Sequence, residues 1–371
     1  MRKLIGIVLF LAIGSLVFDA YAQTRKSYVI GALIPFQTVE GIDMRRGIEL
    51  AQEEVNAAWG KLGQRLNVIF EPTGGAVTEL TVEKLVQQYK APLVLGGYSS
   101  GVSEAALSYL KYHKIFQIPI GSAYPIFNMM DLGEMGRQLA NFAIKDSGAQ
   151  TVGILTVGNA IGTEIENSIK KALGEAGRKI VSEVRYVVNK GKYLENLESL
   201  FKYRPQIVFF IPIGVETKEI LEQASEIGFK TKIGWYSTYV DLWEKYVIPE
   251  TLEGIKGFKV GVKELLYENY TYKYTKIFNE KPKTVLGPFA YDATKLAALT
   301  LNQAKSTKYD DLIGTWISVA DAYEGITGDK KFDKDGRRIL KKYETVIYEK
   351  GRLVSYSPCP VPPLCSKQIV Y

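Results

Sequence analysis

Short apolar runs alternate with amphipathic helical patterns along most of this chain of 371 residues. The run from 207 to 211 is continuously apolar, as in strands that are covered on both faces of a sheet. Between 41 and 59, apolar residues recur every three or four positions, which predicts a helix with one buried face. We expect further strands at 28–34, 66–70, 93–95, 115–118, 151–156, 180–186 and 232–236, with helices at 77–89, 102–112, 135–144, 161–176, from 193, and at 216–227.

This alternation predicts an α/β fold of two lobes. Strands separated by helices of ten or more residues form crossover units, and these build parallel sheets. Three helices end at Gly148, Gly177 and Gly228, where a left-handed residue is expected. The pattern runs through two series, and the chain is longer than one core usually serves. We therefore expect two doubly wound parallel-sheet lobes.

The connections after the strands are the expected ligand-binding loops. In open parallel sheets, ligands bind outside the carboxyl ends of the strands. The loops that follow the predicted strands are 35–41, 96–101, 121–125, 158–162, 212–215 and 236–239.

The N-terminus has the features of a secretory signal. Arg2 and Lys3 precede an apolar run from 4 to 18, and Ala20 and Ala22 supply the small residues that a signal peptidase recognises. We expect cleavage after Ala22, a signal peptide at 1–22, and an extracytoplasmic location in the periplasm or at the cell exterior. The alternative is an uncleaved N-terminal anchor. No cysteine follows the apolar run as a lipid attachment point.

The charge balance does not favour nucleic-acid binding. The net charge is +7, and it becomes +6 when Arg2, Lys3 and Asp19 leave with the signal. The basic residues are spread along helices rich in Lys and Glu, whereas nucleic-acid binding requires a basic patch. A solvated surface of mixed charge is the simpler interpretation.

The two cysteines, Cys359 and Cys365, lie in a proline-rich tail at 357–371. Outside the cell they can close a local disulfide loop, and free thiols are the alternative. Two cysteines and one histidine are too few for a zinc site of the usual kind. We expect neither a metal nor a cofactor.

No motif in the chain points to catalysis. The phosphate loop, the dinucleotide turn and the zinc-protease helix motif are all absent from the sequence. His113, the only histidine, lies between a predicted helix and a predicted strand, where a surface histidine is the ordinary explanation. The segment 331–342 fails as a calcium loop because Lys331 and Lys342 occupy ligand positions. It fits a turn between strands better, and we expect a binding protein, not an enzyme.

Five segments in order resemble the type I periplasmic binding proteins, specifically the leucine/isoleucine/valine-binding branch of ABC-transporter substrate-binding proteins. These are Ile34-Pro35 followed by Gly41 and RGIELA at 46–51, LGGYSS at 95–100, IPIGSAYP at 118–125, YDA at 291–293 as a helix start, and YEGITG at 323–328 with FDKDG at 332–336.

The resemblance implies two lobes that close about a hinge of three crossing strands. It places the crossings near Asp131, Gly254–Gly257 and Gly325–Gly328. The implied N-terminal lobe is 27–131 with 257–325, and the C-terminal lobe is 132–256 with 326–356.

The resemblance also implies a ligand site. Ser99 and Ser100 match a serine that holds a carboxylate in the family, and Gly121 matches a backbone contributor. Ala123 replaces a threonine, and Asp131 lies close to a family acid. Ile161 and Ile213 replace tyrosines, and Ser237 replaces an acid. The implied ligand-binding residues are Ser99, Ser100, Gly121, Ser122, Ala123, Tyr124, Ile161, Ile213, Tyr236 and Ser237.

These departures favour a solute other than a standard amino acid. An ammonium group needs acceptors because a buried unpaired charge is costly. Isoleucines favour an uncharged or partly apolar solute, such as an amide, a nucleobase-like compound or a small aromatic, unless they belong to the core.

The resemblance implies a monomeric solute-binding protein of an ABC importer, with membrane permease subunits as partners. The alternatives are a ligand-sensing receptor module of the same fold and an extracytoplasmic hydrolase. Permease genes beside this gene would favour transport, whereas a kinase gene would favour sensing.

Overall fold

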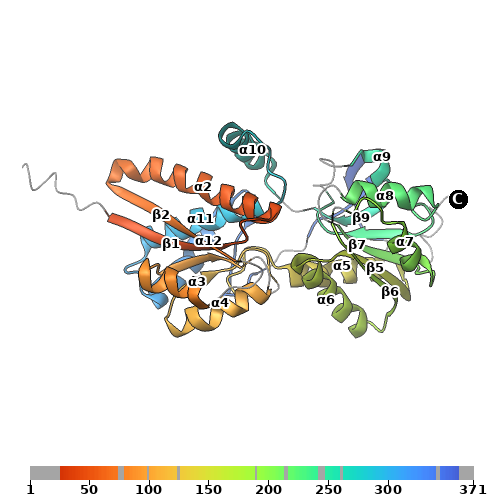
Figure 1. Cartoon of the computed structure of the whole chain (residues 1–371), viewed down its shortest axis with the longest axis horizontal. Helices are drawn as coiled ribbons and strands as arrows, with labels where there is room; N and C mark the ends of the chain where they lie inside the picture. The colour runs from red at the N-terminus through yellow and green to blue at the C-terminus, as the bar shows by residue number, and fades with distance from the viewer. Residues whose placement is uncertain are drawn as a thin grey trace, which may run out of the picture.

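A computed structural model describes residues 26–73, 79–97, 100–122, 126–188, 190–212, 216–240, 247–259, 262–339 and 343–358. The described chain forms two α/β lobes side by side, each built on its own sheet (Figure 1). Within these ranges, no helix is long and apolar enough to cross a membrane.

The first lobe is built on a four-stranded parallel sheet in the order β2-β1-β3-β4. Its strands are β1 (Lys26–Ile34), β2 (Gln64–Pro72), β3 (Leu93–Gly96) and β4 (Phe116–Ile118). One face is covered by α2 (Val39–Trp59), α11 (Leu286–Gln303) and α12 (Tyr309–Ala322). The other face is covered by α3 (Glu79–Glu83), a π-helical turn (Lys84–Gln88) and α4 (Ser100–Tyr112), while α10 (Glu264–Phe278) packs on α2.

The second lobe is built on a seven-stranded sheet in the order β13-β12-β9-β8-β7-β5-β6. Five strands are parallel: β5 (Thr151–Val157), β6 (Lys179–Tyr186), β7 (Ile207–Ile211), β8 (Gly234–Ser237) and β9 (Ile255–Phe258). The strands β12 (Thr345–Glu349) and β13 (Arg352–Ser355) extend the edge as an antiparallel pair. The helices α5 (Leu132–Ser147), α6 (Ala160–Glu175), α7 (Leu194–Phe201), α8 (Glu216–Glu226) and α9 (Pro249–Leu252) surround it.

The predicted fold class of parallel-sheet α/β lobes is confirmed. The three helix-ending glycines have φ of 65° (Gly148), 63° (Gly177) and 75° (Gly228), the left-handed region that a side chain disfavours. The YDA segment at 291–293 was expected to start a helix, but α11 begins five residues earlier, at Leu286. The segment 332–336 forms a turn closed by a bridge between Phe332 and Arg338.

Three connections link the two lobes, and they are described except for residues 123–125, 260–261 and 340–342. The chain passes from β4 to α5, from β9 to α10, and from the short pair β10 (Glu324–Gly325) and β11 (Gly328–Asp329) to β12. The crossings are hydrogen-bonded to one another, since Lys263 N donates to Ile326 O at 2.8 Å and Lys259 N donates to Glu344 O at 3.0 Å. The implied crossing at Gly254–Gly257 overlaps β9, in the second sheet, and Gly325–Gly328 joins β10 to β11.

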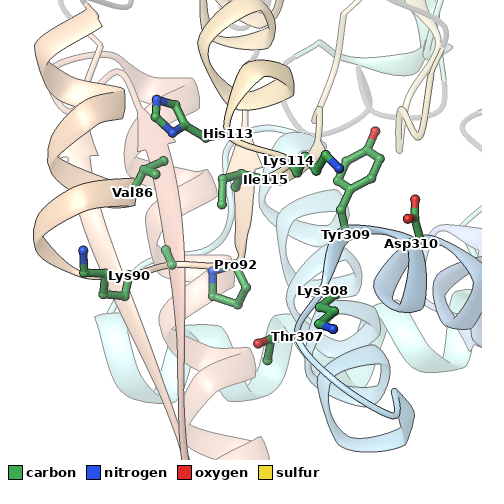
Figure 2. A pocket seen from close by; sticks show the side chains of 11 residues that line it. Val86, Lys90, Pro92, His113, Lys114, Ile115, Thr307, Lys308, Tyr309 and Asp310 are labelled. Carbon is green, nitrogen blue, oxygen red and sulfur yellow. The ribbon is translucent and has the colours of Figure 1, made fainter.

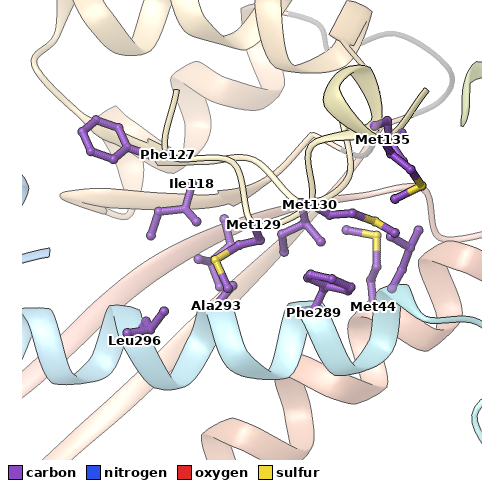
Figure 3. Close-up of a cluster of buried hydrophobic side chains, with 14 of the residues drawn as sticks. Met44, Ile118, Phe127, Met129, Met130, Met135, Phe289, Ala293 and Leu296 are labelled. Carbon is purple, nitrogen blue, oxygen red and sulfur yellow. The ribbon is translucent and has the colours of Figure 1, made fainter. Parts of the chain in front are cut away.

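The first crossing is anchored to the first lobe by apolar side chains (Figure 3). Met129 and Met130 lie over α11, close to Phe289 and Ala293, and Met130 is 2% exposed. Methionine fills irregular gaps because its side chain is unbranched and flexible. This crossing therefore has a fixed base on the first lobe.

Candidate functional site

The carboxyl ends of both sheets lie beside the crossings. After β4, Ser122 forms a parallel bridge with Asp131, whose side chain caps α5 by accepting from Glu134 N at 2.8 Å. Along α5, a Cβ on Gly136 would lie 2.6 Å from Ile165 O in α6. The first crossing leads directly into α5, and α5 therefore lies against α6. Since α6 follows the carboxyl end of β5, the carboxyl end of β5 also lies near the crossings. We take the two carboxyl edges as the candidate site.

In the first lobe, the loops after β3 and β4 lie side by side. Gly96 and Gly97 have φ of 106° and 87°, and a Cβ on Gly96 would meet Leu33 O at 2.3 Å. The Gly97 carbonyl accepts from Ile120 N at 3.2 Å. This contact places Gly97, three residues before α4 begins at Ser100, next to Gly121, whose φ is 76°. The described parts of two predicted ligand loops therefore lie together.

Ser122 is fully buried at the start of the first crossing. Its carbonyl accepts hydrogen bonds from Asn128 Nδ2 and, at 3.2 Å, from Leu132 N. The main chain of Ser122 therefore holds the crossing in place. Its ligand contact remains a prediction.

In the second lobe, the loop after β5 leads tightly into α6. Asn159 caps the helix by accepting from Gly162 N at 2.9 Å. A Cβ on Gly162 would lie 2.2 Å from Val157 O, so the turn requires glycine. Ile161, in the first turn of α6, is partly buried and packs against the main core cluster. At least part of the Ile161 side chain therefore packs in the core. The sequence had left open whether this isoleucine belongs to the core or to the ligand site.

Tyr236 and Ser237 end β8 with their side chains on opposite faces. The Tyr236 hydroxyl donates to Asp146 Oδ2 at 2.5 Å, and Lys256 Nζ donates to the same oxygen at 2.7 Å. Burial, followed by the nearby Asp146 charge, raises the pKa of Tyr236. The phenol thus lies in the interior of the second lobe. The Ser237 hydroxyl is also buried and donates to Phe210 O.

Two buried threonines and one arginine were not predicted as site residues. Thr156, near the end of β5, and Thr217, in the first turn of α8, have hydroxyls without a hydrogen-bond partner in the described structure. Arg338 donates to Met129 O and, at 3.3 Å, to Asp329 O, and it interacts electrostatically with Asp131. Burial lowers the pKa of Arg338. A single threonine in an apolar strand or an arginine after a turn gives no recognisable sequence signal.

Several predicted residues lie outside the described residues. These are Ser99, Ala123, Tyr124, Ile213 and both tail cysteines, Cys359 and Cys365.

A groove in the described structure lies at the opposite edge of the first sheet, where the strands begin (Figure 2). It is lined by residues just before β3 and β4 and at the start of α12, among them Lys90, His113 and Tyr309. The His113 ring contacts Tyr109 and Tyr112, with centroids 4.4 and 4.9 Å away. The groove is separate from the two carboxyl edges.

Solved structures with the same fold cover most of the chain. The isoleucine complex of the branched-chain amino acid substrate-binding protein LivJ from Streptococcus pneumoniae has a TM-score of 0.68 at 18% identity, covering 89% of this chain and 98% of its own. The leucine-binding protein LivK of Thermotoga maritima has a TM-score of 0.66 at 18% identity, covering 89% and 98%. An ABC-transporter solute-binding protein of Rhodopseudomonas palustris, in complex with 3,4-dihydroxybenzoic acid, has a TM-score of 0.69 at 16% identity, covering 89% and 95%.

At these identities the likeness shows the fold. No curated protein sequence matches the chain. A family model does match, and it spans residues 28–351, which include every strand of both sheets except β13 and the first two residues of β1. The chain belongs to the periplasmic binding protein family.

Proposed function

We propose that this chain is the extracytoplasmic solute-binding protein of an ABC importer and that it captures a small organic solute between its two lobes. The observation that carries the proposal is the position of the two carboxyl edges, which both lie beside the three crossings. In open parallel sheets, this is the edge that binds ligands. Rotation about the crossings would close the lobes on the solute, as in hinged binding proteins.

The groups at the site favour a solute with a carboxylate on a partly apolar body. The guanidinium of Arg338 lies among the crossings, and the α6 N-terminus attracts negative charge. The unpaired hydroxyls of Thr156 and Thr217 can donate to a carboxylate or accept from an amide. Ile161 adds an apolar surface. The related structures were solved with isoleucine, with benzoate and with 3,4-dihydroxybenzoic acid, all of which carry a carboxylate.

The remaining parts of the proposal concern export and partners. The N-terminal segment would direct export and be cleaved after Ala22, and the mature protein would act as a monomer that docks on permease subunits. The hinge would lie near Asp131, Gly254–Gly257 and Gly325–Gly328, with the lobe boundaries given above. N-terminal sequencing of the exported protein tests the cleavage.

Thermal unfolding in the presence of candidate solutes tests the binding function. The panel contains leucine, isoleucine, benzoate, dihydroxybenzoate, aromatic amides and purines. A solute with micromolar affinity, present at millimolar concentration, stabilises the folded state by about 4 kcal/mol. We expect the largest shift from an aromatic or amino-acid-like carboxylate. A panel without any shift would contradict the proposal, and a purine as the best ligand would contradict the proposed solute class.

A matched pair of serine variants tests the first lobe. Ser100 opens α4 beside Gly97, whereas Ser108 is an exposed residue further along the same helix. Ser100→Ala should weaken binding of the best solute, because the Ser100 hydroxyl would donate to the carboxylate of the solute. The expected loss in binding free energy is about 1.5–3 kcal/mol, the contribution of a hydrogen bond to a charged group. Ser108→Ala should leave affinity unchanged. Equal affinities for both variants would remove Ser100 from the site.

A further inference from the structure

The edge of the first sheet where its strands begin collects positive charge. We call this group the basic edge. Because β1, β2, β3 and β4 are all parallel, their starting ends share one edge, at the left end of the molecule in Figure 1. The exposed members lie at these strand starts, in the connections that lead into them and into α12, and in the last turn of α4: Lys26, Lys61, Arg65, Lys90, Lys111, Lys114, Lys305 and Lys308.

Residues distant in sequence meet at this edge. Lys90, Lys114 and Lys308 line one groove, with Lys114 beside Tyr309 (Figure 2). Lys26 pairs in register with Gln64 at the start of β2. Counted along β1, this pair lies four residues before the position beside which β3 and β4 begin. This offset corresponds to about 13 Å along the strand. A modest tilt of the lobe would bring both parts of the basic edge to one plane.

Within the part of the chain that the structure describes, the members of the basic edge form no ion pair with an acidic residue. None of them takes part in the ion pairs found among the described residues. Elsewhere on the same lobe, Lys84 pairs with Glu71 at 2.6 Å and Lys273 pairs with Glu54 at 2.7 Å. The charge of the basic edge is thus available to a partner.

The basic edge accounts for most of the excess charge of the protein. Its eight cations lie beside two acidic residues, Asp310 and Asp311, in the first turn of α12, which leaves a net charge of +6. The net charge of the whole chain is +7. An excess this localised produces a directional field that attracts an extended anionic partner.

We propose that the basic edge docks on a membrane surface of anionic lipid headgroups. Two exposed side chains among the cations, Leu62 at 61% and Tyr112 at 83%, are suited to the headgroup region. The chain also enters this edge at Lys26, and the residues before it include the apolar run from 4 to 18.

This orientation leaves the candidate solute site free. The basic edge lies at the starts of the strands, while the proposed site lies at their carboxyl ends, across the lobe. A protein held by the basic edge would not cover its ligand loops with lipid. The membrane proposal does not depend on the identity of the solute.

Vesicle co-sedimentation tests the proposal. The chain from Gln23 onward, which contains every described residue, is mixed with vesicles of phosphatidylcholine alone or of equal parts phosphatidylcholine and phosphatidylglycerol. Each basic residue near an anionic membrane strengthens binding about fivefold. We expect binding only to the phosphatidylglycerol vesicles, and we expect it to fall when NaCl rises from about 0.05 M to about 0.5 M, because salt shortens the screening length.

Two variants of equal net charge separate the edge from general charge. The edge variant combines Lys90→Gln, Lys111→Gln, Lys114→Gln and Lys308→Gln. The control combines Lys145→Gln, Lys171→Gln, Lys276→Gln and Lys281→Gln, all exposed and away from the edge. We expect the edge variant to bind at least about tenfold more weakly than the control.

Several results would overturn the proposal. Absence of wild-type binding to phosphatidylglycerol vesicles would do so, as would equal losses in the two variants or binding to phosphatidylcholine alone. Binding to heparin or DNA without binding to vesicles would mean that the edge recognises a soluble polyanion. Far-UV circular dichroism of both variants, unchanged from wild type, shows that the fold is kept.

Discussion

Asp292 holds the third crossing on the first lobe, and its removal should be costly. Its carboxylate accepts from Thr327 N at 2.8 Å, Ile326 N at 3.1 Å and Tyr323 Oη at 3.0 Å, and from the Thr327 hydroxyl. Asp292 is fully buried, and Lys330, also fully buried, is its electrostatic neighbour. A buried carboxylate with four donors is therefore the centre of this contact.

The expected cost of Asp292→Ala follows from these contacts. The amides of Ile326 and Thr327 would be left unsatisfied, at about 1–3 kcal/mol each. Lys330, which is fully buried, would lose its strongest opposing charge, which adds to the cost. Relief of the desolvation of the carboxylate offsets part of the sum. We expect a loss of about 3–5 kcal/mol in the free energy of unfolding, within the range for breaking a buried charged contact.

Urea unfolding followed by circular dichroism measures the loss in the free energy of unfolding. Hydrogen exchange shows which amides are affected. The amides of Ile326 and Thr327 should lose protection in Asp292→Ala. Tyr323→Phe removes one donor and should cost about 1 kcal/mol. A loss below about 1.5 kcal/mol in Asp292→Ala, or unchanged protection of the two amides, would refute this account of the carboxylate.

Three further predictions concern stability. Burial opposes ionisation of Glu54, but Lys273, Lys295 and Tyr291 donate to its carboxylate and lower its pKa to about 2, so the ionised carboxylate stabilises the fold above about pH 4.5 and loses this effect as pH falls toward 2. In urea unfolding, wild type should lose about 2 kcal/mol more than Glu54→Gln between pH 6 and pH 3. An equal dependence of the unfolding free energy on pH in the two proteins would contradict this. Burial lowers the pKa of Lys230 to about 8, so the cost of burying its charge should be relieved as pH rises from 8 to about 10.5. Over this range the free energy of unfolding of wild type should rise by about 2 kcal/mol relative to that of Lys230→Met. A parallel pH dependence of the two free energies would argue against this role of Lys230. Gly41→Ala would place a Cβ 1.7 Å from the Pro35 carbonyl oxygen and should lower the melting temperature. Gly60 has open space around it and a helical φ, so Gly60→Ala should stabilise the fold by about 0.4–1 kcal/mol and raise the melting temperature. The reverse order of melting temperatures would be inconsistent with this packing.

The periodic parts of the fold could be predicted, whereas side-chain destinations could not. Strand 207–211 has the predicted bounds, because a continuous apolar run between a helix and a proline leaves little freedom. The Tyr236 hydroxyl donates to Asp146, 90 residues earlier in the chain, and the sequence did not indicate this partner. Alternation along a strand gives the face of a side chain but not its partner on a distant helix.

The same limit applies to charge. Along the sequence, Lys26, Lys90 and Lys308 lie far apart in separate connections, and their spacing suggests a solvated surface. The parallel topology brings these connections to one edge of one sheet. A basic patch built in this way has no linear signature, because parallel strands bring together segments that are tens of residues apart.

Two of the short motifs acquire a common physical explanation in the structure. The aspartate of YDA at 291–293 and the glycine of YEGITG at 323–328 are in contact, since a Cβ on Gly325 would lie 2.5 Å from Asp292 Oδ2. The glycine is required because the carboxylate occupies that space, and the carboxylate is held there by the amides that follow the glycine. Each motif is weak alone. Together they form one hydrogen-bonded unit that fixes the start of a crossing to α11, so their joint presence in the sequence carries more information about the fold than either motif does.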